Sequence, residues 1–276
     1  MSCETTTEIS VVTPSYNQAK FIEDNIKSVM QYDSPTVEHI IVDGGSTDGT
    51  VEILKSYESK YNLRWVSEPD DGQSYAINKG IEMADGEWIG WQNADDYYLP
   101  DALHTFEKHT KDSLDVVYGD QLFTDQHGSE IDRRYHTKTS KLVQKHWEHF
   151  TANSCTLVRK SVFDKIGNIN TEFEYMMDAE LFWRLLVADL RYYHIPKFLG
   201  VRRLHEEAKT VGQEYLNSEQ YKWESDILYD YSTIEKQLPE MLLKIMAIGL
   251  KSGYLASEGR YEGISHMISG IINNRF

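Results

Sequence analysis

The chain has 276 residues, of which 40% are hydrophobic, and its 18 Tyr, 9 Phe and 6 Trp are enough for a substantial core. These values exclude a disordered chain and allow one large α/β domain with a smaller appendage. The net charge of −16 excludes nucleic-acid binding through bulk electrostatics, because phosphate neutralisation needs clustered Lys and Arg.

The two cysteines, Cys3 and Cys155, are too few for a disulfide framework, so we expect a reducing compartment. The first residues lack the basic and apolar regions of a signal peptide. No apolar run approaches the roughly 18 residues that a membrane-spanning helix needs. We therefore predict a cytoplasmic protein, either free or at the inner face of the membrane.

Four short runs rich in apolar and β-branched residues predict strands, at 9–14, 37–42, 63–67 and 87–91. Apolar residues at helical spacing lie between them, beginning with Phe21, Ile22 and Ile26. The third of these helices has a face of small residues around Gly80, which would allow close packing on a sheet. The alternation of strand and helix predicts an α/β fold with a mostly parallel central sheet flanked by helices.

Acidic residues stand at the carboxyl ends of three of these strands: Asp43, Asp70, and the adjacent pair Asp95 and Asp96. Each alone is typical of a turn or a helix cap. Their recurrence at equivalent positions predicts one crevice, since ligands of open α/β sheets bind beyond the carboxyl ends of the strands. Adjacent carboxylates repel each other unless a cation or a proton intervenes, and a divalent metal is the simplest neutraliser at neutral pH.

The sequence has no dinucleotide-binding glycine motif and no P-loop after any of these strands. Because acidic residues rather than a lysine stand at the crevice, a diphosphate would have to be held through a bridging Mg²⁺ or Mn²⁺. A sugar-1-phosphate nucleotidyltransferase would need a glycine-rich basic loop after the first strand, and residues 15–19 do not provide one.

The pattern changes after Pro100. We expect a helix at 101–109, strands at 115–118, 153–158 and 198–204, a turn at 125–129 and a short helix at 161–166. Asp178 stands at the start of an amphipathic helix, as an N-cap or as a functional carboxylate. His205 follows the last strand, as a structural histidine or as a ligand.

Six motifs, taken in order, resemble those of one family. They are Val12-Thr13-Pro14-Ser15-Tyr16-Asn17, Asp43-Gly44-Gly45-Ser46, Asp70-x-Gly72 with Ala76-x-Asn78-Lys79-Gly80, Asn93-Ala94-Asp95-Asp96, Met177-Asp178-x-Glu180, and His205 with Lys209-Thr210. Together they resemble the inverting, metal-dependent glycosyltransferases of family 2, which have the A-type glycosyltransferase fold of the nucleotide-diphospho-sugar transferase superfamily. The resemblance extends from about residue 8 to residue 210.

The resemblance implies a role for each matching position. Asp178 would be the catalytic base. Asp95 would be the main ligand of Mn²⁺ or Mg²⁺, with His205 as a second ligand and Asp96 as a less favoured one. Asp43 would accept a hydrogen bond from the nucleotide base. The other implied contacts to the nucleotide sugar are Thr13, Pro14, Tyr16, Asp70, Asn78, Asn93, Ala94 and Asp95.

Two positions depart from the family pattern. Asn93 replaces the first Asp of the usual Asp-x-Asp metal motif, so it brings no charge to a metal. Tyr75 stands where related sequences often have Asp, which bears on the donor pocket.

The resemblance implies transfer of a sugar from a nucleoside-diphosphate donor, with UDP favoured over dTDP or GDP. The acceptor would be a glycan or lipid-linked hydroxyl, in surface polysaccharide or other glycan assembly. The alternative is a non-catalytic nucleotide-sugar-binding or scaffold subunit. We expect a catalytic domain at 1–210, with 8–110 as its nucleotide-sugar half and 111–210 as its acceptor half. Residues 211–276 would be a helical extension that supports a homodimer or peripheral membrane association.

Overall fold

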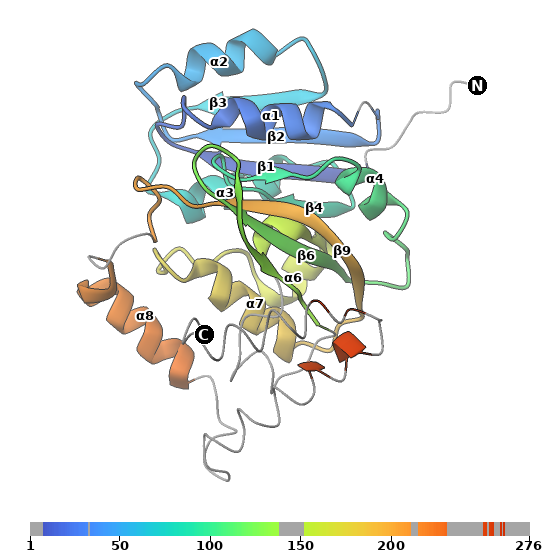
Figure 1. The fold of residues 1–276 in the computed structure, drawn as a ribbon. Coiled ribbons are helices and arrows are strands. Elements are labelled where there is room, and N and C mark those ends of the chain that lie inside the picture. The colour runs from blue at the N-terminus through green and yellow to red at the C-terminus, as the bar shows by residue number, and fades with distance from the viewer. Residues whose placement is uncertain are drawn as a thin grey trace.

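The computed structural model describes residues 8–32, 34–137, 152–210 and 215–230, together with 251–252, 254–256, 260 and 262. These residues form a β-sheet with helices on both of its faces (Figure 1). None of the helices among them is long and apolar enough to cross a membrane. Most of the predicted helical extension lies outside the described residues.

The first half of the chain forms the parallel part of the sheet, as the alternation predicts. β1 (Ile9–Ser15) lies between β2 (Val37–Asp43) and β4 (Trp88–Trp91), and β3 (Leu63–Ser67) pairs with β2. All three pairings are parallel. The crossovers contain α1 (Ile22–Met30), α2 (Thr50–Tyr57) and α3 (Gln73–Met83). The carboxyl ends of these strands therefore open onto one edge of the sheet.

The second half of the chain makes the sheet mixed rather than wholly parallel. It adds β5 (Tyr97–Tyr98), β6 (Val116–Thr124), β7 (Glu130–Arg134), β8 (Thr156–Arg159) and β9 (Tyr192–Arg203). The strand order is β3-β2-β1-β4-β8-β6-β9-β5, with β7 paired to β6. The longest pairing of this half, between β6 and β9, is also parallel. β8 is antiparallel to β4 and β6, and β7 is antiparallel to β6. The turn between β6 and β7 is too short for a parallel crossover, which needs a dozen or more residues.

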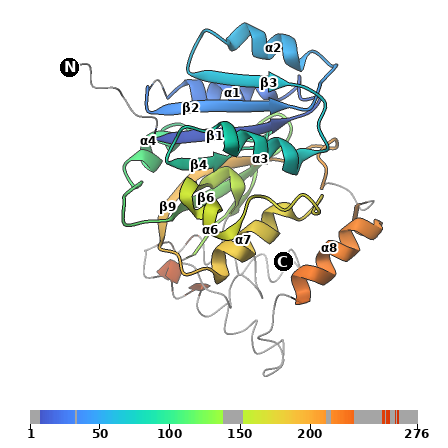
Figure 2. The ribbon, with the colours of Figure 1, turned by 180° about the vertical axis from the view of Figure 1, so that it is seen from behind.

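The helices form two layers around the sheet. The remaining ones are α4 (Ala102–Glu107), α6 (Lys160–Ile166), α7 (Met177–Val187) and α8 (Glu219–Asp230), with 3₁₀ turns η1 (Asn153–Cys155) and η2 (Tyr215–Asn217). Figures 1 and 2 show α1 and α4 on one face of the sheet, and α3, α6 and α7 on the other. α8 lies beside α7 in both views.

The continuous apolar sequence of β1 follows from burial on both faces. Val11 and Val12 are both fully buried, and successive side chains of a strand point to opposite faces. Val11 belongs to the apolar cluster with Val29 of α1, whereas Val12 belongs to the cluster with Ile77 of α3. A strand covered on both faces has no polar side to alternate with, so its hydrophobic run is uninterrupted.

Gly80 brings α3 close to β1 and confirms the expected role of the small-residue face. A Cβ atom added at Gly80 would lie only 2.3 Å from Cγ1 of Val12. The helix can approach the strand this closely because that position has no side chain.

We expect Gly80→Ala to lower the free energy of unfolding by about 1–3 kcal/mol, because overpacking outweighs the better helix propensity of Ala. Urea unfolding measures the effect. The matched control is the same change in a Val12→Ala background, where the clashing methyl groups are gone and the cost should fall by more than half. An equal cost in both backgrounds would contradict the proposed contact.

Candidate active site

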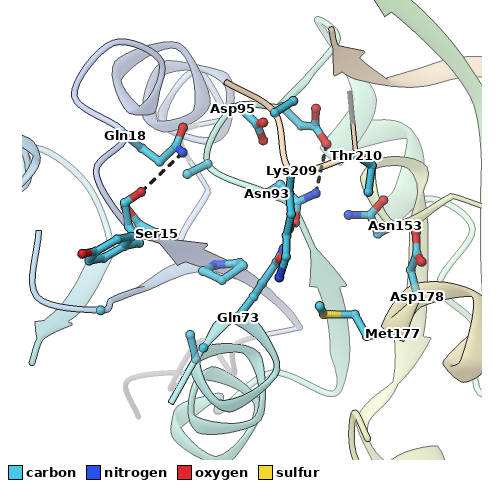
Figure 3. A pocket seen from close by; sticks show the side chains of 18 of the residues that line it. Ser15, Gln18, Gln73, Asn93, Asp95, Asn153, Met177, Asp178, Lys209 and Thr210 are labelled. Atoms are coloured by element: carbon cyan, nitrogen blue, oxygen red, sulfur yellow. Dashed lines mark hydrogen bonds between the residues drawn. The ribbon is translucent and has the colours of Figure 1, made fainter. Parts of the chain in front are cut away.

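A cleft of about 690 Å³ opens at the carboxyl ends of the parallel strands. It is lined from β1 and its following loop, from the loops after β2, β3 and β4, from the start of α7, and from the end of β9 with the segment after it. Its volume is in the range of pockets that bind small molecules and cofactors. Figure 3 shows Ser15 and Gln18 on one side of this cleft and Asp178 on the other, with Asp95, Asn93 and Lys209 between them.

The loop after β4, which carries Asn93 to Asp96, is held by hydrogen bonds from neighbouring elements. Asn25, which is fully buried on α1, donates from Nδ2 to the carbonyl oxygens of Asn93 at 2.9 Å and Asp96 at 3.0 Å. Oδ1 of Asn93 accepts hydrogen bonds from Trp91 Nε1 and from Gln73 Nε2, each at 2.9 Å. The side-chain nitrogen Nδ2 of Asn93 donates to Asp96 Oδ2 at 3.5 Å. The loop is therefore fixed before any ligand binds.

Asp95 and His205 lie side by side although 110 residues separate them in sequence. His205 Nε2 and Asp95 Oδ2 are 2.9 Å apart. The His205 ring is buried, with its centroid 4.3 Å from that of Phe21, and its Nδ1 has no hydrogen-bond partner among the described residues. The Asp95 side chain is 21% exposed and lines the cleft. The structure thus brings together the two residues predicted as metal ligands.

Asp96 faces a different environment from its neighbour. Its carboxyl group is buried, and its Oδ1 accepts a hydrogen bond from the Arg203 backbone N–H at 3.0 Å. Burial, followed by the adjacent charge of Asp95, raises the pKa of Asp96 well above the usual value. The described residues contain no group of three or more His, Cys, Asp and Glu side chains arranged to hold a metal ion. Asp95 is thus the better placed of the two carboxylates to face a ligand.

The structure places basic side chains in the cleft, where we expected acidic ones alone. Arg202 at the end of β9 and Lys209 just beyond it both line the cleft. Arg202 Nη2 donates to Thr210 Oγ1 at 2.8 Å. Lys209 Nζ lies 3.5 Å from a carboxylate oxygen of Glu174 and 5.4 Å from the ring centroid of Tyr175. The sequence motifs include Lys209 but assign it no contact, and they do not include Arg202, because β9 joins the site from the far half of the chain.

Asp178 lies within the first turn of α7 rather than at its cap. The helix begins at Met177, the capping position is Met176, and no side chain caps it. The N-cap interpretation of Asp178 is therefore wrong. Its half-buried carboxylate lines the cleft, and its Oδ1 accepts a hydrogen bond from the Ala179 N–H at 2.7 Å. Free N–H groups at a helix start favour a negative charge, so this position suits an ionised carboxylate.

Six residues predicted to contact the nucleotide sugar line the cleft: Pro14, Tyr16, Asp70, Asn93, Ala94 and Asp95. The Tyr16 side chain is 63% exposed, so its ring is available to a ligand. The carboxylate of Asp70 accepts one hydrogen bond from the Gly72 N–H at 2.9 Å. Of the two predicted metal ligands, Asp95 is among these six, whereas the buried His205 lies outside the lining.

The three other predicted contacts, Thr13, Asp43 and Asn78, lie outside the lining of the cleft. The Thr13 hydroxyl is buried against His39, with 2.9 Å between Oγ1 and Nε2. Asn78 donates to the Ile169 carbonyl oxygen and accepts from the Ile169 N–H, each at 2.9 Å. We expected the Asn78 side chain at the donor, but both of its polar atoms bind the backbone of another loop.

Asp43 is fully buried behind the loop that follows β2. Its carboxylate accepts hydrogen bonds from the N–H of Gly45 at 3.2 Å, from the N–H and hydroxyl of Ser46 at 2.9 and 2.5 Å, and from the Ser67 hydroxyl at 2.6 Å. The loop is thereby held to both carboxylate oxygens of Asp43. Asp43 shapes this loop, and Gly44 rather than Asp43 lines the cleft.

Comparison with known families matches residues 10–167 to the glycosyl transferase family 2 model. The chain belongs to glycosyl transferase family 2. The match includes the acidic loops of the first half and ends before Asp178 and His205.

Three relatives of this family 2 protein match different shares of its chain. An uncharacterised glycosyltransferase of Rickettsia typhi is 27% identical over 265 residues, which cover 90% of this chain and 82% of the relative. The putative teichuronic acid biosynthesis glycosyltransferase TuaG of Bacillus subtilis is 34% identical over 48% of this chain and 54% of its own length. The chondroitin synthase of Escherichia coli is 27% identical over 74% of this chain but only 30% of its own length.

Solved structures confirm the A-type glycosyltransferase fold. S. aureus TarS, residues 1–349 in complex with UDP-GlcNAc, superposes with a TM-score of 0.64 at 17% identity, over 91% of this chain and 73% of TarS. The mannosyltransferase PcManGT of Pyrobaculum calidifontis, in complex with GDP-Man and Mn²⁺, gives a TM-score of 0.60 at 16% identity, over 99% of this chain and 88% of its own. At these identities the likeness concerns the fold.

Beneath the cleft, His39 is buried between two hydroxyl groups. Its Nε2 lies 2.9 Å from Thr13 Oγ1 and its Nδ1 lies 2.7 Å from the Tyr61 hydroxyl. Burial lowers the pKa of His39 to about 3, so the ring is neutral when the protein is folded at neutral pH.

This burial predicts a pH dependence of stability. The unfolded chain takes up a proton at His39 near pH 6.5, which the folded protein resists until about pH 3. The stabilising contribution is therefore present above pH 6.5 and is lost as the pH falls. Between pH 7 and pH 5 we expect the free energy of unfolding to fall by about 2 kcal/mol more in the wild type than in His39→Gln.

Urea unfolding at several pH values measures this difference. His127→Gln is the matched control, because it removes a histidine from an exposed turn. Parallel pH profiles for the wild type and His39→Gln would contradict the assignment of a buried, neutral His39.

Proposed function

We propose that this protein is a metal-dependent, inverting glycosyltransferase that uses a nucleoside-diphosphate sugar. The observation that carries the proposal is the meeting of three chemical elements at one cleft: the Asp95 carboxylate with the buried His205 behind it, the cationic Arg202 and Lys209, and the carboxylate of Asp178. The metal ligands and the cationic side chains would assist departure of the diphosphate. The carboxylate of Asp178 would activate an acceptor hydroxyl.

The Asp95–His205 pair fits a divalent cation. A carboxylate oxygen and an imidazole nitrogen are both common metal ligands, and Asp95 is open to the cleft. Two protein ligands are enough, because Mg²⁺ at nucleotide sites is usually held by one or two carboxylates together with substrate phosphates. When bound, the ion would supply positive charge for the departing diphosphate. The presence of Mn²⁺ with GDP-Man in the PcManGT complex supports this assignment.

Arg202 and Lys209 would bind the oxygens of the diphosphate. Both side chains reach the cleft from the β9 side, beside the loop that carries Asp95. Fixed positive charges that face the leaving group stabilise the charge that develops there in the transition state. The guanidinium of Arg202 also offers paired N–H donors that match phosphate geometry.

Asp178 would be the catalytic base. It would take the proton from an acceptor hydroxyl while the oxygen of that hydroxyl attacks the anomeric carbon of the donor sugar. Attack from the face opposite the departing diphosphate inverts the configuration at that carbon. The position of Asp178 across the cleft from Ser15 and Gln18 supports a donor that lies lengthwise, with its nucleoside near Tyr16 and its sugar toward Asp178 (Figure 3).

The donor class we favour is a UDP-sugar, with dTDP or GDP as alternatives. TarS in complex with UDP-GlcNAc supports UDP, and PcManGT with GDP-Man keeps GDP open. The proposed acceptor is a glycan or lipid-linked hydroxyl in cytoplasmic assembly of a surface polysaccharide or other glycan, which the teichuronic acid and chondroitin relatives support. Residues 8–110 would hold the nucleoside and sugar of the donor, and 111–210 would hold the acceptor and add Arg202, His205 and Lys209 to the diphosphate site. The alternative function is a non-catalytic nucleotide-sugar-binding or scaffold subunit.

A nucleoside diphosphate should stabilise the protein only when a divalent cation is present. Thermal unfolding with UDP, GDP, dTDP or CDP, each with and without Mn²⁺, measures this effect. At a hundred times its dissociation constant a ligand adds about 2.7 kcal/mol to the stability of the folded state. We expect Asp95→Ala to abolish the metal-dependent part, because it removes the exposed carboxylate ligand.

Asp112→Ala is the matched control, since it removes an exposed carboxylate from a turn outside the cleft. If none of the nucleotides stabilises the wild type with Mn²⁺, the cleft is not a competent donor site and the scaffold function takes the place of the transferase. Full metal dependence in Asp95→Ala would disprove the assigned ligand.

Asp178→Asn should abolish sugar transfer and leave nucleotide binding within about twofold of the wild type, because the amide cannot accept the acceptor proton. Nucleotide release from the donor measures turnover, and the thermal assay measures binding. Asp164→Asn, which changes an exposed carboxylate on α6, should keep full activity. Turnover by Asp178→Asn at the wild-type rate would eliminate Asp178 as the base.

A further inference from the structure

A buried carboxylate on α8 lies against the loop that leads into α7. Glu224 has no exposed surface. Its two oxygens accept hydrogen bonds from three consecutive backbone N–H groups, those of Glu174 at 2.5 Å, Tyr175 at 3.0 Å and Met176 at 2.7 Å. The side-chain amide of Gln220, one turn earlier on α8, donates a fourth at 2.7 Å. Glu224 is thus the common acceptor for the whole loop.

Consecutive backbone N–H groups that converge on one point form a concave site for an anion. In this protein a side-chain carboxylate fills that site, and charge-assisted hydrogen bonds of this kind are stronger than neutral ones. An uncharged amide cannot replace it, since Gln would turn an N–H group toward at least one of the backbone N–H groups. The arrangement therefore depends on the charge of Glu224 and on the length of its side chain.

The loop held by Glu224 is part of the cleft. Glu174 and Tyr175 line the cleft, and α7 begins immediately afterwards with Met177 and Asp178. From the opposite side, the Ser74 hydroxyl of α3 contacts the Phe173 carbonyl oxygen at 3.1 Å and the Met177 sulfur at 3.2 Å. The start of α7 is therefore fixed between α3 and α8.

We propose that Glu224 is a positioning residue for the transfer reaction: by binding the backbone of residues 174–176, it sets where the carboxylate of Asp178 lies in the cleft. This inference rests on the proposed function of Asp178. It also gives the part of the chain beyond residue 210 a role in the site, because α8 supplies a contact that the sheet and its crossover helices do not. A shift of about 1 Å in a catalytic group is enough to lower a rate about a hundredfold.

Hydrogen exchange of the backbone amides tests the anchoring directly, without any substrate. In Glu224→Gln we expect the amides of residues 174–176 to exchange at least tenfold faster than in the wild type, while the amides of α3 exchange at the wild-type rate. The matched control is Asp226→Asn, which removes an exposed carboxylate from the same helix. Unchanged protection of residues 174–176 in Glu224→Gln would overturn the proposal.

Turnover tests the positioning. With UDP-glucose or UDP-GlcNAc as donor and water as acceptor, release of UDP should fall at least tenfold in kcat for Glu224→Gln, and the donor KM should stay within twofold. Circular dichroism and thermal unfolding establish the folded fraction, so that a loss of stability is not mistaken for a loss of rate. Glu224→Asp, which keeps the charge, should recover part of kcat.

The outcomes separate this inference from the proposed function. If Asp178→Asn is inactive but Glu224→Gln turns over at the wild-type rate, Asp178 is the base and the positioning role of Glu224 is wrong. If Asp178→Asn is as active as the wild type, the proposed function fails and the positioning role fails with it. The same holds if the wild type releases no nucleotide from the sugars of any diphosphate that stabilises it in the thermal assay. The exchange experiment reports the anchoring of residues 174–176 in every case.

Discussion

The pairing of β5 with β9 is the constraint on which the candidate site depends. β5 has only two residues, yet its antiparallel pairing places the loop of Asp95 beside the strand that ends just before His205. The pairing is supported by Tyr98, which is almost fully buried, and by Gly200, where an added Cβ would lie 1.8 Å from the Ser154 carbonyl oxygen. β9 can pass this close to η1 only without a side chain at that position. Packing, rather than the short strand itself, therefore holds the two halves of the site together.

Buried polar side chains do most of the positioning around the cleft. Asn25 holds the loop after β4, Asp43 holds the loop after β2, and Glu224 binds the loop before α7. Each is buried with its hydrogen-bonding atoms paired to backbone and side-chain groups, which offsets the cost of removing those atoms from water. A cleft supported in this way keeps its shape in the absence of ligand, which is what a transferase needs to align a donor with an acceptor.

The motifs of the first half predicted which loops form the cleft better than which side chains face it. Pro14, Tyr16 and Asp70 line the cleft, whereas Asp43 and Asn78 match the family pattern equally well and bind the protein's own backbone. The reason is that a carboxylate or an amide can serve a ligand or a loop with the same hydrogen bonds. Sequence identifies the chemical group, and the surrounding backbone donors decide what it binds.

By itself, the sequence determined the alternation of strand and helix up to β4, the placement of acidic residues at the carboxyl ends of the strands, and membership of a glycosyltransferase family, because these follow from local periodicity and short motifs. Only the tertiary structure decided that the second half joins the sheet in mixed directions, that Arg202 and Lys209 enter the cleft, and that Glu224 binds the loop before α7. These features join segments about 50 to 110 residues apart. Long-range pairing depends on how buried surfaces and backbone donors fit together, and a local pattern of residues carries no record of that fit.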